Sequence, residues 1–323
     1  MEADRLNSPS TSVITFEVLG HQLQFSQDPN SKHLGTTVWD SSMVFAKFLE
    51  KNCRKGRFCP SKLKGRRVIE LGAGCGVAGF GMALLGCDVV STDQIEVVSL
   101  LRRNIERNTS RIMQMNSNSD SFGSIRVAEL DWGNEDHIKA VAPPFDYIIG
   151  TDVVYAEHLL GPLLKTIIAL SGPKTTIMLG HEIRCTSVHE QMLQTWKKFF
   201  EVKIVPRAKM DSKYQHPSIQ LFIMGLKTPA VTAEKPDNAV SAENLDKKTQ
   251  GIDQQVNEVK TRKTDREEGQ NCGNGTGVDD LDGEVIKEDC LQVTRLPDGK
   301  LSDWEARRYG SMAARLLRDI KIT

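Results

Sequence analysis

Apolar residues recur with two different periods over the first 227 residues of the chain. Short alternating or continuous apolar runs, typical of strands, are followed by longer runs with apolar residues three or four positions apart, typical of helices. Val13–Val18 and Gln22–Phe25 flank Leu19-Gly20-His21 and predict a β-hairpin. The pattern then predicts helices over Thr37–Glu50, Val77–Leu85, Ile95–Asn108, Leu159–Leu170 and Val188–Phe199. It predicts strands over Arg66–Leu71, Asp88–Thr92, Ser124–Leu130, Tyr147–Asp152, Thr175–Gly180, Glu201–Val205 and Gln220–Leu226.

Repeated strand–helix units predict an α/β fold with a doubly wound, Rossmann-like sheet of seven mostly parallel strands. No helix separates the last two predicted strands, Glu201–Val205 and Gln220–Leu226. We therefore expect the final strand to insert antiparallel, as part of a hairpin. In an open α/β sheet, ligands bind outside the carboxyl ends of the strands, so candidate site residues are sought there.

The composition changes after Lys227. Only 39% of the 323 residues are apolar, below the ~45–50% typical of globular domains, so part of the chain is not expected to pack. Of the 4 Trp, 4 Tyr and 11 Phe, none lies between Thr228 and Lys300, a stretch with 16 acidic and 10 basic residues. Such a composition predicts disorder. We therefore divide the chain into a flexible N-terminus (1–12), a folded domain (13–227), a disordered acidic linker (228–300) and a C-terminal segment (301–323).

The C-terminal segment has its own helical pattern. Ser302 and Glu305 form a capping box, and Trp304, Met312, Leu316 and Ile320 recur at steps of four or eight residues. The pattern predicts a short amphipathic helix. Docking on its own domain, binding a partner and remaining frayed are all compatible with it.

Charge and cysteine usage exclude several classes of protein. The 42 basic and 42 acidic residues cancel, which argues against a whole-chain nucleic-acid binder. No apolar run approaches the ~18–20 residues of a membrane span, and the polar start lacks the pattern of a signal peptide. The seven cysteines form no CxxC pair or zinc pattern, so we predict no metal site. We expect a soluble monomer with reduced thiols, in the cytosol or also the nucleus.

The most informative stretch is Val68–Gly79. A short apolar strand runs into glycines at alternate positions, Gly72, Gly74 and Gly76, and then into a predicted helix. Glycine permits a sharp turn and a close approach of the backbone to a ligand, and the helix start presents free N–H groups. The spacing Gly74-x-Gly76-x-x-Gly79 also satisfies the dinucleotide fingerprint, which is weak evidence alone.

Two acidic residues narrow the choice of ligand. Glu70 lies just before the glycines, where an acid suits an amine or a sulfonium rather than a pyrophosphate. Asp93 closes the next predicted strand, 17 residues beyond Gly76, where a carboxylate can accept hydrogen bonds from both ribose hydroxyls. A tight strand–helix turn without a ligand is the alternative interpretation.

With these residues in place, the sequence resembles the seven-β-strand methyltransferases that use S-adenosyl-L-methionine. It is most similar to the methyltransferase-like 21 group of protein-lysine methyltransferases, especially the branch that modifies valosin-containing protein. The resemblance covers about Thr36 to Lys227. The matching motifs are Gly35–Asp40 (the family's tryptophan motif), Glu70–Gly76 (its ExGxGxG loop), Thr92-Asp93, Leu130–Gly133 and Thr151–Tyr155 (its DxxY motif with the preceding Thr).

The resemblance implies cofactor-binding roles for the matched residues. The Gly72–Gly76 loop, including Ala73, and Asp93 would hold the methionyl and ribose ends of S-adenosylmethionine, with Glu70 ahead of them. Asp131 and Trp132 would lie at the adenine, Trp39 would cover the cofactor, and Thr151 would form the backbone floor of the pocket. From the pattern alone, Trp39 could equally be a core anchor and Asp131 could cap a turn.

The chemistry of methyl transfer gives Asp152 and Tyr155 candidate catalytic roles. A free lysine has a pKa of ~10.4, so the enzyme must align the amine and supply it uncharged. A nearby sulfonium in a dry pocket favours the neutral amine. Asp152 would orient the amine and pass its proton toward solvent, and Tyr155 would wall the aliphatic stem. Asp152 could instead cap the turn after its strand.

Other functions remain as alternatives. Ala142-Pro143-Pro144-Phe145 is a near-match to the [DN]PP[FYW] motif of enzymes that methylate planar amino groups, but it lacks the leading acid or amide and precedes the strand. A small-amine methyltransferase is the alternative enzyme. A cofactor-binding subunit without turnover and a nicotinamide-cofactor protein are the alternatives of other classes. Glu70 argues against the nicotinamide protein, and Asp152 with Tyr155 argues against the inactive subunit.

Two further segments carry charge. Residues 51–67 contain eight basic side chains, which could dock an acidic or nucleic-acid partner or aid nuclear entry; a solvated loop is the simpler interpretation. His181-Glu182-Ile183-Arg184 follows a predicted strand at its active edge. It could shape the substrate pocket, or form a buried ion pair that organises the loop. The predicted function is methylation of a lysine in a non-histone protein substrate, without membrane or nucleic-acid partners.

Overall fold

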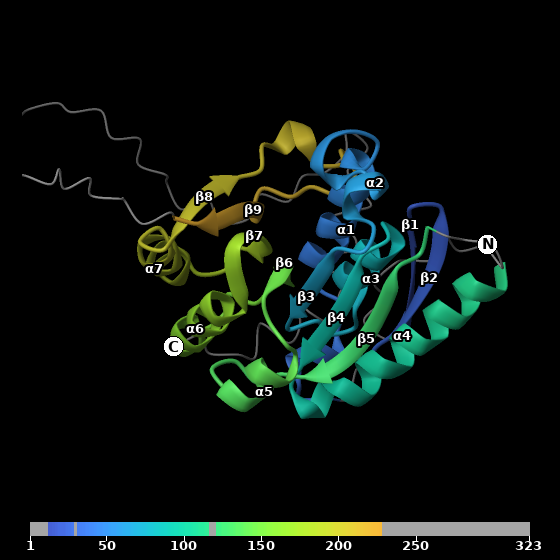
Figure 1. Cartoon of the computed structure of the whole chain (residues 1–323), viewed down its shortest axis with the longest axis horizontal. Coiled ribbons are helices and arrows are strands. Elements are labelled where there is room, and N and C mark those ends of the chain that lie inside the picture. Colours follow the sequence, from blue (N-terminus) through green and yellow to red (C-terminus); the bar gives the residue numbers. More distant parts are fainter. Residues whose placement is uncertain (1–11, 29–30, 116–120, 228–323) are drawn as a thin grey trace, which may run out of the picture. The chain divides into compact units, whose positions relative to one another are not determined.

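The computed structural model describes residues 12–28, 31–115 and 121–227 of the chain. The expected linker (228–300), the expected C-terminal helix (301–323) and most of the expected flexible N-terminus lie outside the described residues. The described part contains a two-stranded sheet and a seven-stranded sheet with helices on both faces (Figure 1). None of the helices in these described ranges combines the length and the apolar character that crossing a bilayer requires.

The strands and helices follow one another along the chain nearly as the periodicity predicts. The strands are β1 (Val13–Val18), β2 (His21–Ser26), β3 (Arg67–Leu71), β4 (Asp88–Asp93), β5 (Ser124–Glu129), β6 (Phe145–Thr151), β7 (Ser171–Glu182), β8 (Phe200–Ile204) and β9 (Ile219–Leu226). The helices are α1 (Asp40–Asn52), α2 (Pro60–Leu63), α3 (Val77–Leu84), α4 (Ile95–Met115), α5 (Glu135–Ala140), α6 (Leu160–Leu170) and α7 (Thr186–Trp196). Short 3₁₀ turns are η1 (Leu34–Thr36), η2 (Gly56–Phe58), η3 (Glu157–Leu159) and η4 (Arg207–Lys209).

The large sheet is doubly wound. Its strand order is β5-β4-β3-β6-β7-β9-β8. Strands β3 to β7 pair in parallel, and β9 inserts antiparallel between β7 and β8. The predicted α/β class and the antiparallel last strand are therefore confirmed. The order reverses between β3 and β6, and this switch point opens a crevice at the carboxyl ends of the two strands.

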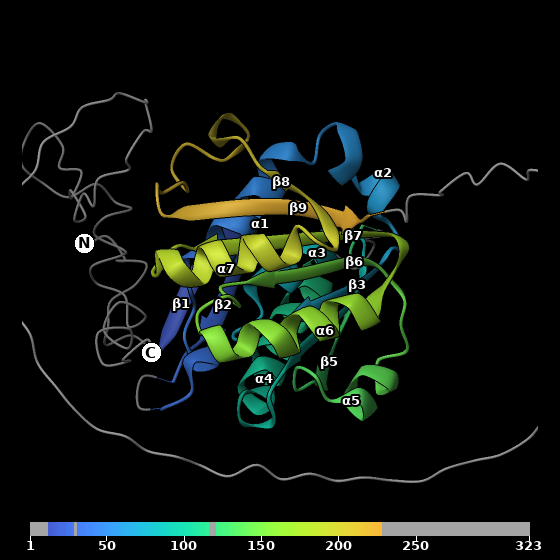
Figure 2. The same ribbon diagram turned by 90° about the vertical axis from the view of Figure 1, so that its left-hand side faces the viewer.

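Alternation along β3 divides the core between the two faces of the sheet. Ile69 and Leu71 pack with α6 and α7, whereas Val68 packs with α1 and α3 on the other face (Figure 2). Because strand side chains alternate with a period of two, Glu70 shares the face of Val68 and points toward α3. The direction of this acid decides its role in the site.

The N-terminal hairpin is held to α4 by two buried asparagines. The side-chain amide of Asn108 accepts from Gln24 N at 2.8 Å and donates to Gln24 O at 2.9 Å. Asn104 makes the same pair of bonds to Ser26, at 2.8 and 3.0 Å, and also donates to Cys75 O in the glycine loop at 3.2 Å. The two amides complete the free edge of β2 as a neighbouring strand would.

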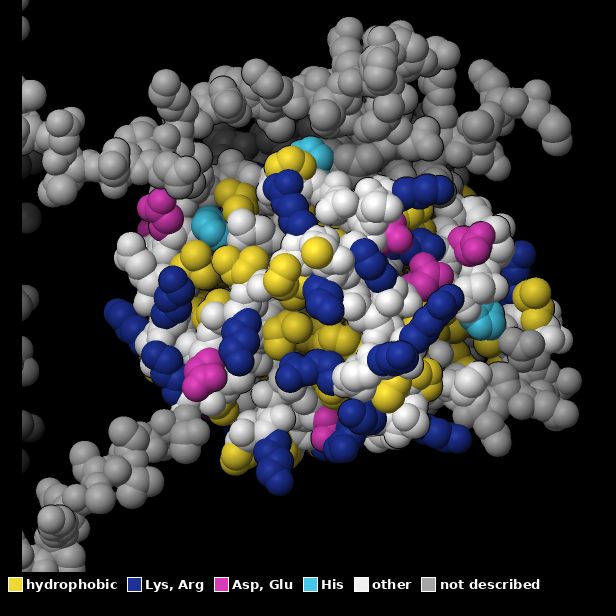
Figure 3. Space-filling view, turned by 90° about the horizontal axis from the view of Figure 1, so that it is seen from above, with side chains coloured by type: hydrophobic (Ala, Val, Ile, Leu, Met, Phe, Trp, Pro, Cys, Tyr) yellow, Lys and Arg dark blue, Asp and Glu magenta, His cyan; other side chains and the backbone are white. Residues whose placement is uncertain are grey.

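Several predicted boundaries were wrong. Helix α1 begins at Asp40 rather than at Thr37, because Thr37 and Trp39 have extended backbones and Val38 N–H donates to the Gln27 side chain at 2.9 Å. Helix α4 continues seven residues beyond Asn108. The sequence did not predict α2 or α5, which have four and six residues. Figure 3 looks onto the face that is uppermost in Figure 1, where α2, β8 and η4 come together and basic side chains gather.

Candidate active site

A cavity of about 390 Å³ lies at the carboxyl ends of β3 and β6. Small-molecule sites commonly have volumes of ~300–1,000 Å³. Its walls come from the loops after β3, β4, β5 and β6 and from the segment ahead of α1. The predicted residues that line it are Trp39, Gly72, Ala73, Gly74, Asp93, Asp131, Trp132, Thr151, Asp152 and Tyr155. The structure therefore brings most of the predicted site residues to one place.

The glycine loop has a backbone that only glycine adopts easily. Gly72 and Gly74 have φ of 59° and 57°, in the left-handed region that side chains with a Cβ avoid. A Cβ on Gly74 would also lie 3.0 Å from Gly35 O, and one on Gly72 would lie 2.9 Å from a methyl of Val153. Gly76 has φ of 92° and precedes α3, but it faces Leu101 on α4 rather than the cavity. Gly76 was expected to contact the cofactor, but in the structure it shapes the loop and does not line the cavity.

Glu70 also differs from the expectation. Its carboxylate accepts hydrogen bonds from Gly79 N at 2.9 Å and from Ser91 Oγ at 2.6 Å, and it does not line the cavity. Burial raises the pKa of Glu70 to about 7, although both hydrogen bonds oppose that shift. The expected direct contact with a cationic ligand is therefore wrong. Glu70 ties β3 to α3 and β4, and so supports the glycine loop from behind.

Asp93 connects the loop to the end of β4. Its Oδ2 accepts from Gly74 N at 2.7 Å and its Oδ1 accepts from Gln94 N at 2.8 Å. Burial raises its pKa despite these two bonds. Each carboxylate oxygen can accept a second hydrogen bond, and the residue lines the cavity. Asp93 can therefore orient the loop and bind a diol at the same time.

Asp152 is held as an anion by Arg184. The two side chains form a bidentate ion pair, with Nη1–Oδ1 and Nη2–Oδ2 distances of 3.0 and 3.1 Å. Burial by itself would raise the pKa of Asp152, but the charge and hydrogen bonds of Arg184 outweigh it and lower the pKa. Asp152 has φ of 57°, a strained conformation that is often found at functional sites.

The same guanidinium lies over the ring of Trp39. Arg184 Cζ is 4.9 Å from the ring centroid, a cation–π geometry. Trp39 also donates from Nε1 to Leu34 O at 3.0 Å. Arg184 further pairs with Glu182 at 2.6 Å, so the ion-pair alternative for this segment is confirmed. Arg184 therefore occupies one face of the Trp39 ring, and Trp39 still lines the cavity.

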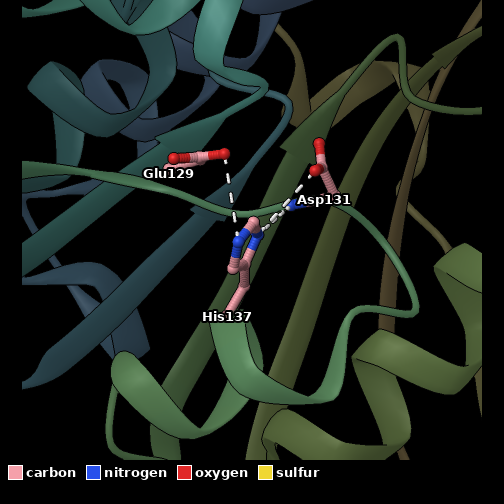
Figure 4. Close-up of side chains that lie close together, drawn as sticks. All are labelled: Glu129, Asp131 and His137. Atoms are coloured by element: carbon pink, nitrogen blue, oxygen red, sulfur yellow. Dashed lines mark hydrogen bonds and ion pairs between the residues drawn. The ribbon is translucent and has the colours of Figure 1, made fainter.

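His137 on α5 positions Asp131 at the rim of the cavity. His137 Nδ1 accepts from Asp131 N at 3.2 Å, and its ring nitrogens lie 3.8 and 3.9 Å from carboxylate oxygens of Asp131 and Glu129 (Figure 4). One potential ligand atom from each residue lies within 4.8 Å of the others. The lone pair of Nδ1 is occupied by the backbone bond, so we assign this cluster to positioning rather than to a metal.

The remaining wall is aromatic. Trp132 lies against Gly72, where its ring atom Cζ2 would be 3.2 Å from an added Cβ. Tyr155 is partly buried, and burial together with the charge of Asp93 raises its pKa. Tyr155 therefore stays a neutral phenol in the physiological range.

A comparison with family models gives the decisive observation. A model described as lysine methyltransferase matches residues 18–202, more than half of the chain. The chain belongs to this lysine methyltransferase family. The family uses S-adenosylmethionine as its methyl donor, and the matched region contains all of the cavity-lining residues described above.

Curated relatives place this lysine methyltransferase in the METTL21 group. Protein N-lysine methyltransferase METTL21A of Danio rerio is 33% identical over 194 residues, covering 60% of this chain and 81% of the relative. The Mus musculus protein of that name is 32% identical, over 53% and 72% of the two chains. EEF1A lysine methyltransferase 3 of Mus musculus is 31% identical, over 51% and 63%. The predicted group is confirmed, and the substrate of this lysine methyltransferase is a protein.

Sequence reasoning missed part of the wall of this lysine methyltransferase. Lys32, His33 and Gln94 line the cavity, but no motif or period marks them. The second function of Arg184, stacking on Trp39, joins residues 145 positions apart. For the ion pair, the sequence did offer a signal, because the cationic Arg184 closely follows Glu182 at the end of a predicted strand.

Proposed function

We propose that this lysine methyltransferase transfers a methyl group from S-adenosylmethionine to the ε-amine of a lysine in a non-histone protein. The observation that carries the proposal is the ionised Asp152, held by Arg184 in the same cavity as the glycine loop and Asp93. An anion beside a cofactor cradle is suited to a cationic or amine acceptor, and lysine is the acceptor of the family.

The residues present fit the cofactor. Gly72 and Gly74 leave bare backbone where a Cβ would close the cradle. We assign the ribose hydroxyls to Asp93, the adenine to Asp131 and Trp132, and the floor to Thr151 and Ala73. When bound, S-adenosylmethionine supplies an electrophilic methyl group on a sulfonium.

The contribution of Asp152 is orientation. Its side chain is 3% exposed, so an amine reaches it only through the cavity. Its Oδ1 accepts from Glu182 N and Arg184, whereas Oδ2 accepts from Arg184, and a second lone pair of Oδ2 is available to an amine N–H. Because a carboxylate with a lowered pKa is a weak base, we propose that Asp152 orients the amine and that the proton leaves by another route. We assign Tyr155 to the wall along the lysine stem.

Two proteins are the first candidate substrates to test, according to the branch of the METTL21 group that the chain resembles. The motif resemblance supports valosin-containing protein, and the relative named EEF1A lysine methyltransferase 3 supports EEF1A as the second. We also propose that the protein acts as a monomer in the cytosol or the nucleus.

The test is transfer of tritium from methyl-labelled S-adenosylmethionine into a hypomethylated cell lysate. Wild type is compared with Asp152→Ala and with a matched control, Asp136→Ala. The Asp136 side chain is 94% exposed on α5, so its loss changes charge but not the cavity. We expect a labelled protein band with wild type and the control, and none with Asp152→Ala.

Two outcomes would contradict the proposal. Label confined to the small-molecule fraction would indicate a small-amine methyltransferase. Equal labelling by Asp152→Ala and wild type would remove Asp152 from the mechanism.

A further inference from the structure

Two distant segments of the chain form one strongly basic surface. Residues 51–67 contain eight basic residues and no acidic one. The β8–η4 segment adds further cations. We define the basic face by seven exposed side chains of these segments, which are Arg54, Lys55, Lys62, Lys64, Lys203, Arg207 and Lys209.

Hydrogen bonds hold the two segments together. Lys51 Nζ at the end of α1 donates to Ala208 O at 3.1 Å, and Asn52 Nδ2 donates to Lys209 O at 2.9 Å. Figures 1 and 2 both place α2 and η4 on the same side of the sheet, and blue side chains outnumber magenta ones on this side in Figure 3. The basic face is therefore a fixed part of the fold.

Neighbouring acids leave most of this charge uncompensated. Asp146 pairs with Arg66 at 3.0 Å, and Asp211 accepts from the backbone of Lys213 and Tyr214. Glu201 is exposed on β8. Within the described residues, no ion pair within 4.0 Å is formed by Arg54, Lys55, Lys62, Lys64, Lys203, Arg207 or Lys209.

Figure 3 shows hydrophobic side chains between the basic ones on this side. At the edge strand of the large sheet, Ile204 ends β8 and is 53% exposed, and Phe199, which is 44% exposed, immediately precedes the strand. Exposed apolar side chains and an unpaired strand edge are suited to protein segments.

We propose that the basic face is a docking site for an acidic surface of the protein substrate. This inference rests on the proposed function. Helix α1 connects the two sites: Trp39, just before its start, lines the cavity, and its end at Asn52 contacts η4. A helix of this length spans ~20 Å. The substrate would present an acidic patch at about that distance from its target lysine.

The first test uses a fluorescein-labelled polyglutamate peptide and the full chain, with binding read by fluorescence anisotropy at low salt. The variant is Arg54→Glu/Lys62→Glu/Lys64→Glu. The control is Arg102→Glu/Arg103→Glu/Arg111→Glu, which makes the same change in net charge on exposed positions of α4. We expect the variant to lose at least about 10-fold in peptide affinity and the control to lose less than about twofold. Unchanged S-adenosylmethionine affinity in both shows that they are folded.

The outcomes separate this inference from the proposed function. Peptide binding involves neither the cofactor nor Asp152, so it can fail while methyl transfer holds. Equal losses in variant and control, or no peptide binding by wild type, would overturn the docking site. Tighter binding of a single-stranded oligonucleotide through the same residues would overturn it in favour of nucleic acid. On an identified protein substrate, the variant should raise KM by about 10-fold and leave kcat within about twofold.

Discussion

Arg184 forms a bidentate ion pair with the carboxylate of Asp152, at 3.0 and 3.1 Å, and its guanidinium lies 4.9 Å from the ring centroid of Trp39. One cation therefore fixes the ionisation of the acid at the end of β6 and the position of the indole before α1. Both partners line the cavity. In the proposed function, this arrangement preorganises Asp152 to orient an amine rather than to carry its proton.

Replacing Arg184 by Lys tests the value of this bidentate geometry. A lysine keeps the charge but supplies neither the two parallel bonds nor the planar stacking on Trp39. We expect kcat to fall by about 10- to 100-fold, because Asp152 loses its fixed position, while S-adenosylmethionine affinity changes little. Steady-state kinetics and calorimetry measure the two effects. Arg103→Lys, on the exposed face of α4, is the control, and an equal effect of both variants would contradict the assignment.

The pH dependence of the rate follows from the lowered pKa of Asp152. A carboxyl with a depressed pKa is ionised throughout the neutral range, so its titration does not limit the reaction between about pH 5 and 8. We expect log kcat/KM to rise with pH as the target lysine, with an ordinary pKa of ~10.4, loses its proton. Asp152→Asn should lower the whole profile without shifting it. An inflection in this window that disappears in Asp152→Asn would contradict the role of Arg184.

Glu70 makes the stability of the folded domain fall as pH rises, whereas the rate is expected to rise. Its folded pKa of about 7 exceeds the ordinary ~4.3, so between these values the folded state holds a proton that the unfolded state has released. The free energy of unfolding should therefore fall by about 3 kcal/mol as pH rises through this window. Glu70→Gln keeps an acceptor for Gly79 N and cannot ionise. Urea denaturation at pH 5 and pH 8 should show a weaker fall in the variant, and parallel falls would count against the burial of this acid.

Two glycines provide a matched test of the loop. Gly74→Ala places a Cβ at φ of 57° and 3.0 Å from Gly35 O, a strain of ~1–2 kcal/mol before any clash. We expect S-adenosylmethionine affinity to fall by about 10-fold or more. Gly161→Ala on α6 meets nothing within 4 Å and should raise stability by ~0.5–1 kcal/mol without changing affinity. Isothermal titration calorimetry and thermal melting distinguish the two. Unchanged affinity in Gly74→Ala would show that the loop does not form the cradle.

The sequence predicts the large sheet well because its strands are short apolar runs that end at glycine or acid. The loop at Gly72–Gly76 was found for this reason. Contacts that depend on tertiary structure were not predicted. The Val38 N–H ahead of α1 bonds to the distant Gln27, and α4 continues past Asn108, whose side chain bonds to β2. In the sequence, a polar residue such as Asn108 resembles the end of a helix, although in the structure it lies within α4 and bonds to the edge of β2.

The same limit applies to the site. Motifs identified Glu70, but only the pairing of β3 with its neighbours shows that the side chain turns toward Gly79 rather than into the cavity. Asp152 was found from its place after β6, whereas its ionisation depends on Arg184, which lies 32 residues later. Spacing therefore located the acids in the sequence, whereas only the folded structure shows which partners each acid contacts.

Separate measurement of cofactor binding and methyl transfer in Asp93→Asn and Asp152→Asn tests the division of roles most directly. The account predicts that Asp93→Asn weakens S-adenosylmethionine binding by at least about 10-fold, because it loses charge at the ribose site and at Gly74 N. It predicts that Asp152→Asn leaves that affinity within about twofold but lowers kcat on the protein substrate by about 100-fold. Loss of cofactor affinity in Asp152→Asn equal to that in Asp93→Asn, or an unchanged kcat, would contradict it.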